Sequence, residues 1–199
     1  MPDSRPKPLL LASTSPHRRV LLERLGLPFL TRSPGVDEAL QAGEAPAERS
    51  LRLAVEKARA VSAQAPGMQV IGSDQVASLE TPGGVAILRK PGTRERCIGQ
   101  LELLSGDTAR FHTSVALAST DGRLLTHTDL TQVVFRELTR EEIIDYVDRE
   151  PSFDCAGGFK CEGLGVSLFE SVATDDPTAL VGLPLIGLCR LLREAGVRV

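Results

Sequence analysis

The stretch Leu9-Leu10-Leu11-Ala12-Ser13-Thr14-Ser15-Pro16-His17-Arg18-Arg19 decides the fold class, because it joins an apolar run directly to the start of a helix. The apolar residues predict a short buried strand, and the polar residues 13–16 end it. Ser15 suits the N-cap of the helix and Pro16 suits its first position. We therefore expect a strand, a tight turn and a helix over residues 17–25, whose inward positions are Val20, Leu21 and Leu25.

The same turn has the chemistry of an anion site. The first N–H groups of a helix have no intrahelical partner, and the helix dipole is positive there. Ser13 and Ser15 make the turn polar, and Arg18 and Arg19 add planar guanidinium groups that match phosphate oxygens. Two cations at a helix start oppose the dipole, which favours a bound anion. A plain Ser-Pro cap with two solvated arginines is an equally open alternative.

Strands and helices alternate along the rest of the chain. We expect a second strand at residues 29–31, a helix over 47–63, and a buried strand at 70–71 that ends at Gly72-Ser73-Asp74-Gln75. A hairpin turn at 81–84 and a helix capped by Thr93 follow, then a hairpin of strands 111–118 and 124–135. Residues 139–142 form a capping box, a Gly-rich stretch 157–165 leads into a strand at 166–169, and the last helix runs from about 184 to 196. This order predicts an α/β unit around a mixed sheet.

The amino-acid composition limits the kinds of molecule that the protein is expected to bind. Hydrophobic residues make up 42% and charged residues 25% of the chain, as in a folded soluble protein. The formal net charge of -3 disfavours a DNA or RNA partner, but a local basic cluster can still bind a small anion. We expect no signal peptide and no membrane helix, because the required apolar runs are missing. The four cysteines lack zinc spacing, so we expect free thiols in a reducing cytoplasm.

Carboxylates and lysines in the first half of the chain could form a metal and phosphate site. Asp74 is expected just past a buried strand, where α/β sheets gather ligands, and its carboxylate can hold a divalent cation or orient a water. A turn-forming aspartate is the alternative. Glu38 supplies a second carboxylate. Lys57 lies on the polar face of its expected helix, where a solvated lysine is the default, and Lys90, which precedes Pro91, can reach either a phosphate or solvent.

Glu162 lies in the segment Phe159-Lys160-Cys161-Glu162-Gly163, whose flanking glycines let the backbone approach a ligand closely. Its carboxylate can accept two hydrogen bonds from a guanine edge, and an exposed loop acid is the alternative. Neither G-x-x-x-x-G-K-[ST] nor G-x-G-x-x-G occurs in the sequence. This excludes the phosphate-loop and dinucleotide-fold classes of nucleotide site.

Together these motifs resemble the Maf family, also called the septum-formation-inhibitor family. The matching segments, in order, are residues 11–19, 36–38, 56–58, 72–76, 90–91, 156–163 and 176–184. They extend from about Leu9 to the end, so the resemblance covers nearly the whole chain.

The resemblance implies a nucleoside triphosphate pyrophosphatase with an α/β fold similar to that of inosine triphosphate pyrophosphatases. One Maf-like domain over residues 9–199 would follow a flexible segment 1–8, with helices flanking a mixed, twisted central sheet and two lobes around a cleft. The implied cofactor is a divalent cation of the magnesium or manganese class at Glu38 and Asp74, with Asp74 also the catalytic base. The residues implied around the phosphates are Ser13, Ser15, Arg18, Arg19, Lys57 and Lys90. The implied partner is a small-molecule nucleotide, without long nucleic acid or membrane; a homodimer is left open.

The resemblance also assigns the preference for the base to His17, Gln75 and Glu162. The Ser-Asp-Gln and Phe-Lys-x-Glu-Gly combinations resemble the 7-methyl-GTP branch, although that branch often has a large aromatic where this chain has His17. Methylation at N7 makes the purine cationic, which independently suits an acid at 162. We expect hydrolysis of 7-methyl-GTP to 7-methyl-GMP and pyrophosphate, which removes a modified nucleotide from the pool. A UTP or dTTP pyrophosphatase, a nucleotide-binding regulator of cell division with little turnover, and a nucleic-acid-binding module remain open alternatives.

Overall fold

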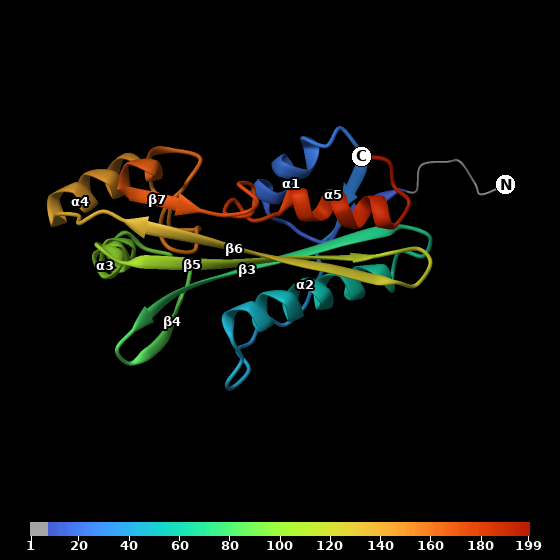
Figure 1. Cartoon of the computed structure of the whole chain (residues 1–199), viewed down its shortest axis with the longest axis horizontal. Coiled ribbons are helices and arrows are strands. Elements are labelled where there is room, and N and C mark those ends of the chain that lie inside the picture. The colour runs from blue at the N-terminus through green and yellow to red at the C-terminus, as the bar shows by residue number, and fades with distance from the viewer. Residues whose placement is uncertain (1–7) are drawn as a thin grey trace. The chain divides into compact units, whose positions relative to one another are not determined.

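The computed structural model describes residues 8–199 (Figure 1). The segment 1–8, expected to be flexible, lies outside the described residues except for Pro8. The elements in chain order are β1 (Leu9–Leu11), α1 (Pro16–Glu23), β2 (Phe29–Thr31), α2 (Pro46–Ser62), β3 (Gln69–Thr81), β4 (Gly84–Leu88), α3 (Arg94–Leu104), β5 (Thr108–Ala118), β6 (Leu124–Phe135), α4 (Arg140–Arg149), a 3-10 helix (Leu164–Leu168), β7 (Phe169–Ala173) and α5 (Leu185–Glu194).

The strands form a mixed sheet with the order β2-β1-β3-β5-β6-β7, and β4 pairs with β3. β1 is parallel to its neighbours β2 and β3, whereas β4 is antiparallel to β3 and β7 is antiparallel to β6. The chain divides into two compact units. Unit 1 comprises the chain up to Gln75, Thr113–Asp129 and Asp176–Val199, and unit 2 comprises Val76–His112 and Leu130–Asp175. The predicted class, α/β with a mixed sheet and flanking helices, is confirmed.

In unit 1 the first strand separates two apolar layers. Successive side chains of a strand point to opposite faces, so Leu9 and Leu11 join one layer and Leu10 and Ala12 the other. The first layer is completed by α1 and α5, which Figure 1 shows on the same side of the sheet. The second layer is completed by α2. Both faces of the sheet in this unit are therefore covered by helices, as the unbroken apolar run Leu9–Leu11 predicts.

Unit 2 is built around four phenylalanines. Their rings meet edge to face, with centroids 5.0 Å apart for Phe159 and Phe169 and 5.6 Å apart for Phe111 and Phe159. Phe135 contacts both Phe159 and Phe169 in the same manner. Such contacts join the end of β6 and the start of β7 to Phe159 in the Gly-rich segment, whose residues 157–163 belong to no helix or strand.

The strand expected to end at Gly72 instead continues as β3 to Thr81, which corrects the predicted turn at residues 72–75. Polar residues can continue this strand because other segments supply their hydrogen-bond partners, which the local sequence does not reveal. Gly72 is required for packing, since a Cβ there would overlap the carbonyl oxygen of Ala54 and lie 2.6 Å from the Ala58 amide nitrogen in α2. Asp74 is therefore held inside a strand and not on a turn.

Two smaller predictions are also wrong. A strand was expected at residues 166–169, but residues 166–168 belong to a 3-10 helix and β7 begins only at Phe169. The apolar run at these positions is too short for its periodicity to distinguish a strand from a helical turn. On α1, Val20 is 55% exposed, and Leu22 takes the inward position that was expected of Val20 beside Leu21.

The predicted N-caps Ser15, Thr93 and Thr139 are all confirmed. Within residues 8–199, none of the helices has both the length and the apolar character needed to span a bilayer.

Candidate active site

A buried ion pair joins α2 to β3 in unit 1. Lys57 Nζ donates a hydrogen bond to Asp74 Oδ1 at 2.6 Å, and the two side chains are only 6% and 9% exposed. Lys57 comes from α2 and Asp74 from β3, so the packing of the helix on the strand fixes their geometry. The expectation that Lys57 is solvated is therefore wrong. Its aliphatic stem lies in the interface between helix and sheet, and its ammonium group reaches a carboxylate.

Glu38 is the second carboxylate on this ammonium. Its Oε1 lies 2.6 Å from Lys57 Nζ, and its side chain is 56% exposed. Arg49 donates to the Glu38 carbonyl oxygen at 2.8 Å, which ties the irregular segment after β2 to α2. One lysine thus joins a buried and a solvent-facing carboxylate, two residues that are far apart in the sequence.

Arg18 completes the group, which we call the Asp74 cluster (Arg18, Glu38, Lys57 and Asp74). Its Nε donates to the carbonyl oxygen of Gly182 at 2.9 Å, across a separation of 164 residues. Burial lowers the pKa of the Arg18 guanidinium, and the charges of Asp74 and Glu38 oppose that change. An arginine stays protonated even so, which leaves a partly desolvated cation at the start of α1.

Two opposing effects act on Asp74. Burial raises the pKa of its carboxyl above the ordinary value, whereas the charges of Lys57 and Arg18 and the hydrogen bond from Lys57 lower it. Glu38 raises it further, as a like charge does. The raised pKa makes Asp74 a stronger base than an exposed aspartate, while the two cations keep its charged form accessible.

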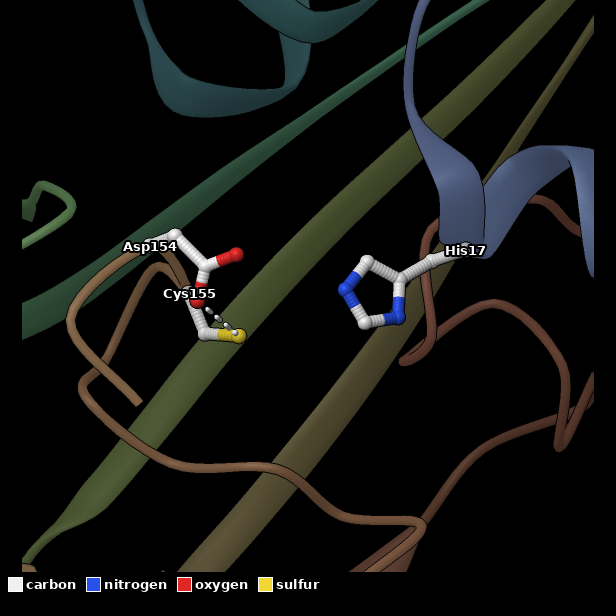
Figure 2. Close-up of side chains that lie close together, drawn as sticks. All are labelled: His17, Asp154 and Cys155. Atoms are coloured by element: carbon white, nitrogen blue, oxygen red, sulfur yellow. Dashed lines mark hydrogen bonds between the residues drawn. The ribbon is translucent and has the colours of Figure 1, made fainter. Parts of the chain in front are cut away.

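The turn before α1 and the first turn of that helix hold three more of the residues expected around phosphate, Ser13, Ser15 and Arg19. Ser13 Oγ accepts from the Ser15 amide at 3.1 Å, and Ser15 Oγ accepts from the Arg18 amide at 3.4 Å, so both hydroxyls shape the helix start. Arg19 points elsewhere, since its exposed guanidinium pairs with Glu23 one turn later at 3.1 Å. His17 extends from the first turn of α1 (Figure 2). The structure brings Arg18, but not Arg19, into the Asp74 cluster.

Gln75 is not directed at an open surface. Its side-chain amide nitrogen lies 3.0 Å from Thr113 Oγ1, from the Ala179 carbonyl oxygen and from the Leu180 carbonyl oxygen. Its neighbour Ser73, fully buried, donates to the carbonyl oxygens of Ser114 and Gly182. Sequence reasoning missed Ser73 and Thr113. The polar run at residues 72–75 of β3 was a signal for Ser73, whereas Thr113 lies in β5 and had no comparable signal.

Lys90 and Glu162 belong to unit 2. Lys90 is exposed in the segment between β4 and α3, and Glu162 is exposed in the Gly-rich segment, where its Oε2 accepts from Cys161 Sγ at 3.4 Å. A similar bond joins Cys155 Sγ to Asp154 Oδ1 at 3.6 Å (Figure 2). Burial raises the pKa of both thiols to about 12, so they stay protonated at neutral pH. All four cysteines are free, as expected.

The carboxylates of the Asp74 cluster fit a hard divalent cation. Magnesium is usually held by one or two carboxylates together with substrate phosphates. Glu38 and Asp74 already place an oxygen each within 2.6 Å of one positive group, the Lys57 ammonium, so both can approach a single cation. The solvent exposure of Glu38 leaves room for water or phosphate on that side.

The chain is similar to known proteins along nearly its full length. The family model described as Maf-like protein matches residues 8–195. A 7-methyl-GTP pyrophosphatase of Xanthomonas oryzae pv. oryzae (strain MAFF 311018) is 58% identical over 188 residues, covering 94% of this chain and 96% of the relative. A protein of the same name from Aromatoleum aromaticum (strain DSM 19018 / LMG 30748 / EbN1) is 52% identical over 190 residues, covering 95% and 96%. Among solved structures, a HAM1 protein from Coxiella burnetii has the same fold, with a TM-score of 0.54 at 16% identity over 94% of this chain and 98% of that one. This chain belongs to the Maf-like protein family.

Proposed function

We propose that the protein hydrolyses a nucleoside triphosphate, preferentially 7-methyl-GTP, to its monophosphate and pyrophosphate. One observation carries the proposal: a buried carboxylate, Asp74, whose pKa is raised by burial, is hydrogen-bonded to a buried lysine and lies in the field of a half-buried arginine. A base and two cations in one place are what water attack on a polyphosphate needs. The names of the full-length relatives support the same reaction.

In the proposed mechanism, Asp74 orients a water and takes its proton as the water oxygen attacks the α-phosphorus. The bond from the α-phosphorus to the bridging oxygen breaks, and pyrophosphate leaves with that oxygen. Arg18 and Lys57 balance the negative charge that builds up on the phosphate oxygens. A divalent cation held by Glu38 and Asp74 would supply further charge neutralisation. Lys90 is a further proposed phosphate ligand.

Substrate preference is proposed from Glu162. The N7-methylated guanine carries a positive charge and two adjacent N–H donors on its Watson–Crick edge. A carboxylate can accept both hydrogen bonds and attract the charge, whereas an amide offers one acceptor atom. We further propose a cytoplasmic location, which suits four free thiols.

The experiment is a substrate panel on the purified chain with magnesium or manganese. Pyrophosphate and mononucleotide release are measured for 7-methyl-GTP, GTP, UTP and dTTP. Stoichiometric release of both products, fastest with 7-methyl-GTP, supports the proposal. Asp74→Asn should lose at least about 100-fold in rate, as expected for removal of a general base. The matched control Asp121→Asn, which alters an exposed aspartate paired with Arg123, should keep the parental rate.

Each other outcome assigns a different function. Faster release from UTP or dTTP would indicate the pyrimidine-directed alternative. Tight nucleotide binding without product release would indicate a regulator with little turnover. An Asp74→Asn variant with activity near the parent's would refute the assignment of Asp74 as the base.

A further inference from the structure

We propose that Tyr146 and Glu150, at the end of α4, are positioning residues for base selection, because they hold the turn that carries Glu162. This inference rests on the proposed function, in which the Glu162 carboxylate binds the base. Neither Tyr146 nor Glu150 was singled out from the sequence, and both belong to unit 2, as does the turn. Their role would be to fix a side chain that contacts the substrate, without contacting the substrate themselves.

The first step is the turn itself. Its first and fourth residues are Lys160 and Gly163, and the Gly163 amide donates to the Lys160 carbonyl oxygen at 3.3 Å. Cys161 and Glu162 are the two central residues, and Glu162 is exposed. The two ends of a turn determine the direction of its central residues. Contacts at Lys160 and Gly163 therefore set where the Glu162 carboxylate lies.

The second step is the anchor at the start of the turn. The Tyr146 hydroxyl oxygen accepts from the Lys160 amide at 3.1 Å and lies 3.1 Å from Ser152 Oγ. Tyr146 is only 2% exposed, and burial raises the pKa of its hydroxyl to about 12, so the hydroxyl stays protonated. Glu150 Oε2, at 3.4 Å, is a further acceptor for this proton. One buried hydroxyl thus joins the end of α4 to the turn.

The third step is the anchor at the end of the turn, which Glu150 supplies. Its Oε2 accepts from the Gly165 amide at 3.2 Å. A Cβ at Gly163 would overlap Glu150 Oε1, and a Cβ at Gly165 would overlap the Lys160 carbonyl oxygen. The glycines of this segment were expected to let the backbone approach a ligand, but the close approach of Gly163 is to the protein's own carboxylate.

The residues before the turn are fixed by other contacts. Phe159 packs against three other phenylalanines, and the Gly158 carbonyl oxygen accepts from Cys97 Sγ at 3.3 Å. Lys160 Nζ donates to the Pro151 carbonyl oxygen at 3.3 Å. Loss of the Tyr146 hydroxyl should therefore displace the turn while the segment stays attached to unit 2.

A positioning role for Tyr146 has a distinct kinetic signature. Tyr146→Phe removes the hydroxyl and keeps the ring. Because a displaced carboxylate meets the base edge less well, we expect the ratio of kcat/KM for 7-methyl-GTP to that for UTP to fall roughly 5- to 50-fold. The loss should appear in KM more than in kcat, and kcat/KM for UTP should stay near the parental value, because the Asp74 cluster is unchanged. A general structural defect would instead lower the rate for every substrate.

The test is a pair of double-mutant cycles on the full chain. Tyr146→Phe is combined with Glu162→Ala in one cycle and with Arg18→Ala in the other. In the Glu162→Ala background, Tyr146→Phe should change the ratio by less than about twofold, because the side chain that it positions is gone. In the Arg18→Ala background its full effect should persist, since Arg18 would bind the phosphates that all of these substrates share.

Glu150→Gln tests the second anchor with the size of the side chain unchanged. The amide keeps one acceptor oxygen where the carboxylate has two, so the ratio should fall in the same direction but by less than with Tyr146→Phe. Asp145→Asn, which alters an exposed carboxylate of α4 paired with Arg149, is the matched control and should leave the ratio unchanged.

Amide hydrogen exchange, followed by NMR on the free protein, reports on the anchor without any turnover. Exchange of the Lys160 amide should be faster in Tyr146→Phe, which lacks the acceptor, and unchanged in Asp145→Asn. An unchanged Lys160 amide in Tyr146→Phe would overturn the inference.

The outcomes separate this inference from the proposed function. Equal losses on all substrates, an unchanged ratio, or an undiminished effect of Tyr146→Phe in the Glu162→Ala background would overturn the positioning role and leave the proposed hydrolysis standing. If the parent releases no pyrophosphate, the proposed function fails, and the same ratios are taken from the Kd values of 7-methyl-GTP and UTP, where the same three outcomes overturn the inference. Should Tyr146→Phe fail to fold, Glu150→Gln takes its place in both cycles.

Discussion

Replacement of Lys57 by methionine tests the electrostatics of the site directly. Methionine has a similar length and a comparable helix propensity, so α2 should persist. The change removes the hydrogen bond from Nζ to Asp74 Oδ1 and leaves a carboxylate that is 9% exposed without its nearest cation. Glu38, with a side chain that is 56% exposed, can turn to water and loses little.

The expected cost is large because one partner of a buried pair remains charged. Removing one member of such a pair typically costs about 3–5 kcal/mol, and Arg18 nearby favours the lower end of that range. We therefore expect a loss of about 3 kcal/mol at pH 7, a shift of roughly 1–3 M in the urea midpoint. Lys57→Met/Asp74→Asn should recover most of this loss, because the uncompensated charge is gone.

The loss should depend on pH in a defined direction. Lys57 lowers the pKa of Asp74 while burial raises it, so the variant has a folded-state pKa raised further above the unfolded value. A group with a raised folded pKa binds a proton on folding. The deficit relative to the parent should therefore be full at pH values above the folded pKa and shrink as the pH falls through it.

The assay is urea unfolding followed by far-UV circular dichroism at pH 7.5 and pH 4.5. Lys90→Met, at an exposed lysine, is the matched control and should stay within about 0.5 kcal/mol of the parent. A deficit below about 1 kcal/mol, or one equal at both pH values, would refute the conclusion that Lys57 neutralises a buried carboxylate.

Three further predictions address binding, specificity and packing. Arg18→Ala should weaken triphosphate binding by about 2 kcal/mol, roughly 30-fold in KM or kcat/KM, while Arg19→Ala, which removes the exposed pair with Glu23, should be near neutral; equal effects would refute the distinction. Glu162→Gln should reduce kcat/KM for 7-methyl-GTP more than for GTP and leave UTP unchanged or improved, by roughly 1–3 kcal/mol in specificity; equal losses on all three would place Glu162 outside base selection. Gly72→Ala should lower the free energy of unfolding by about 1–3 kcal/mol, because the new methyl group meets backbone atoms of α2; a thermal unfolding midpoint like the parent's would show that α2 can shift.

The order of the strands and helices was predictable because local signals fix it. The run Leu9–Leu11 and the Ser-Pro cap after it predict β1 and α1, and the hairpin turn between β3 and β4 forms where Pro82 and Gly83 stand. Errors occurred where apolar periodicity was weak. The polar residues 72–75 stay in β3 because their partners come from α2 and from residues 179–182, which no local pattern can show.

The sequence by itself determined the α/β class, the helix start with its serine cap, and the identity of Asp74, Glu38, Lys57 and Arg18 as candidates, since motif and composition carry that information. Only the tertiary structure decided what these residues do to one another. The burial of Lys57 between two carboxylates, the exclusion of Arg19, and the hydrogen bonds of Gln75 to residues 179–180 depend on contacts between segments as far apart as 164 residues. The directions of these side chains and their removal from water determine the pKa values at the site. Side-chain direction and removal from water are fixed only when α2 and residues 179–182 pack against the strand that carries Asp74.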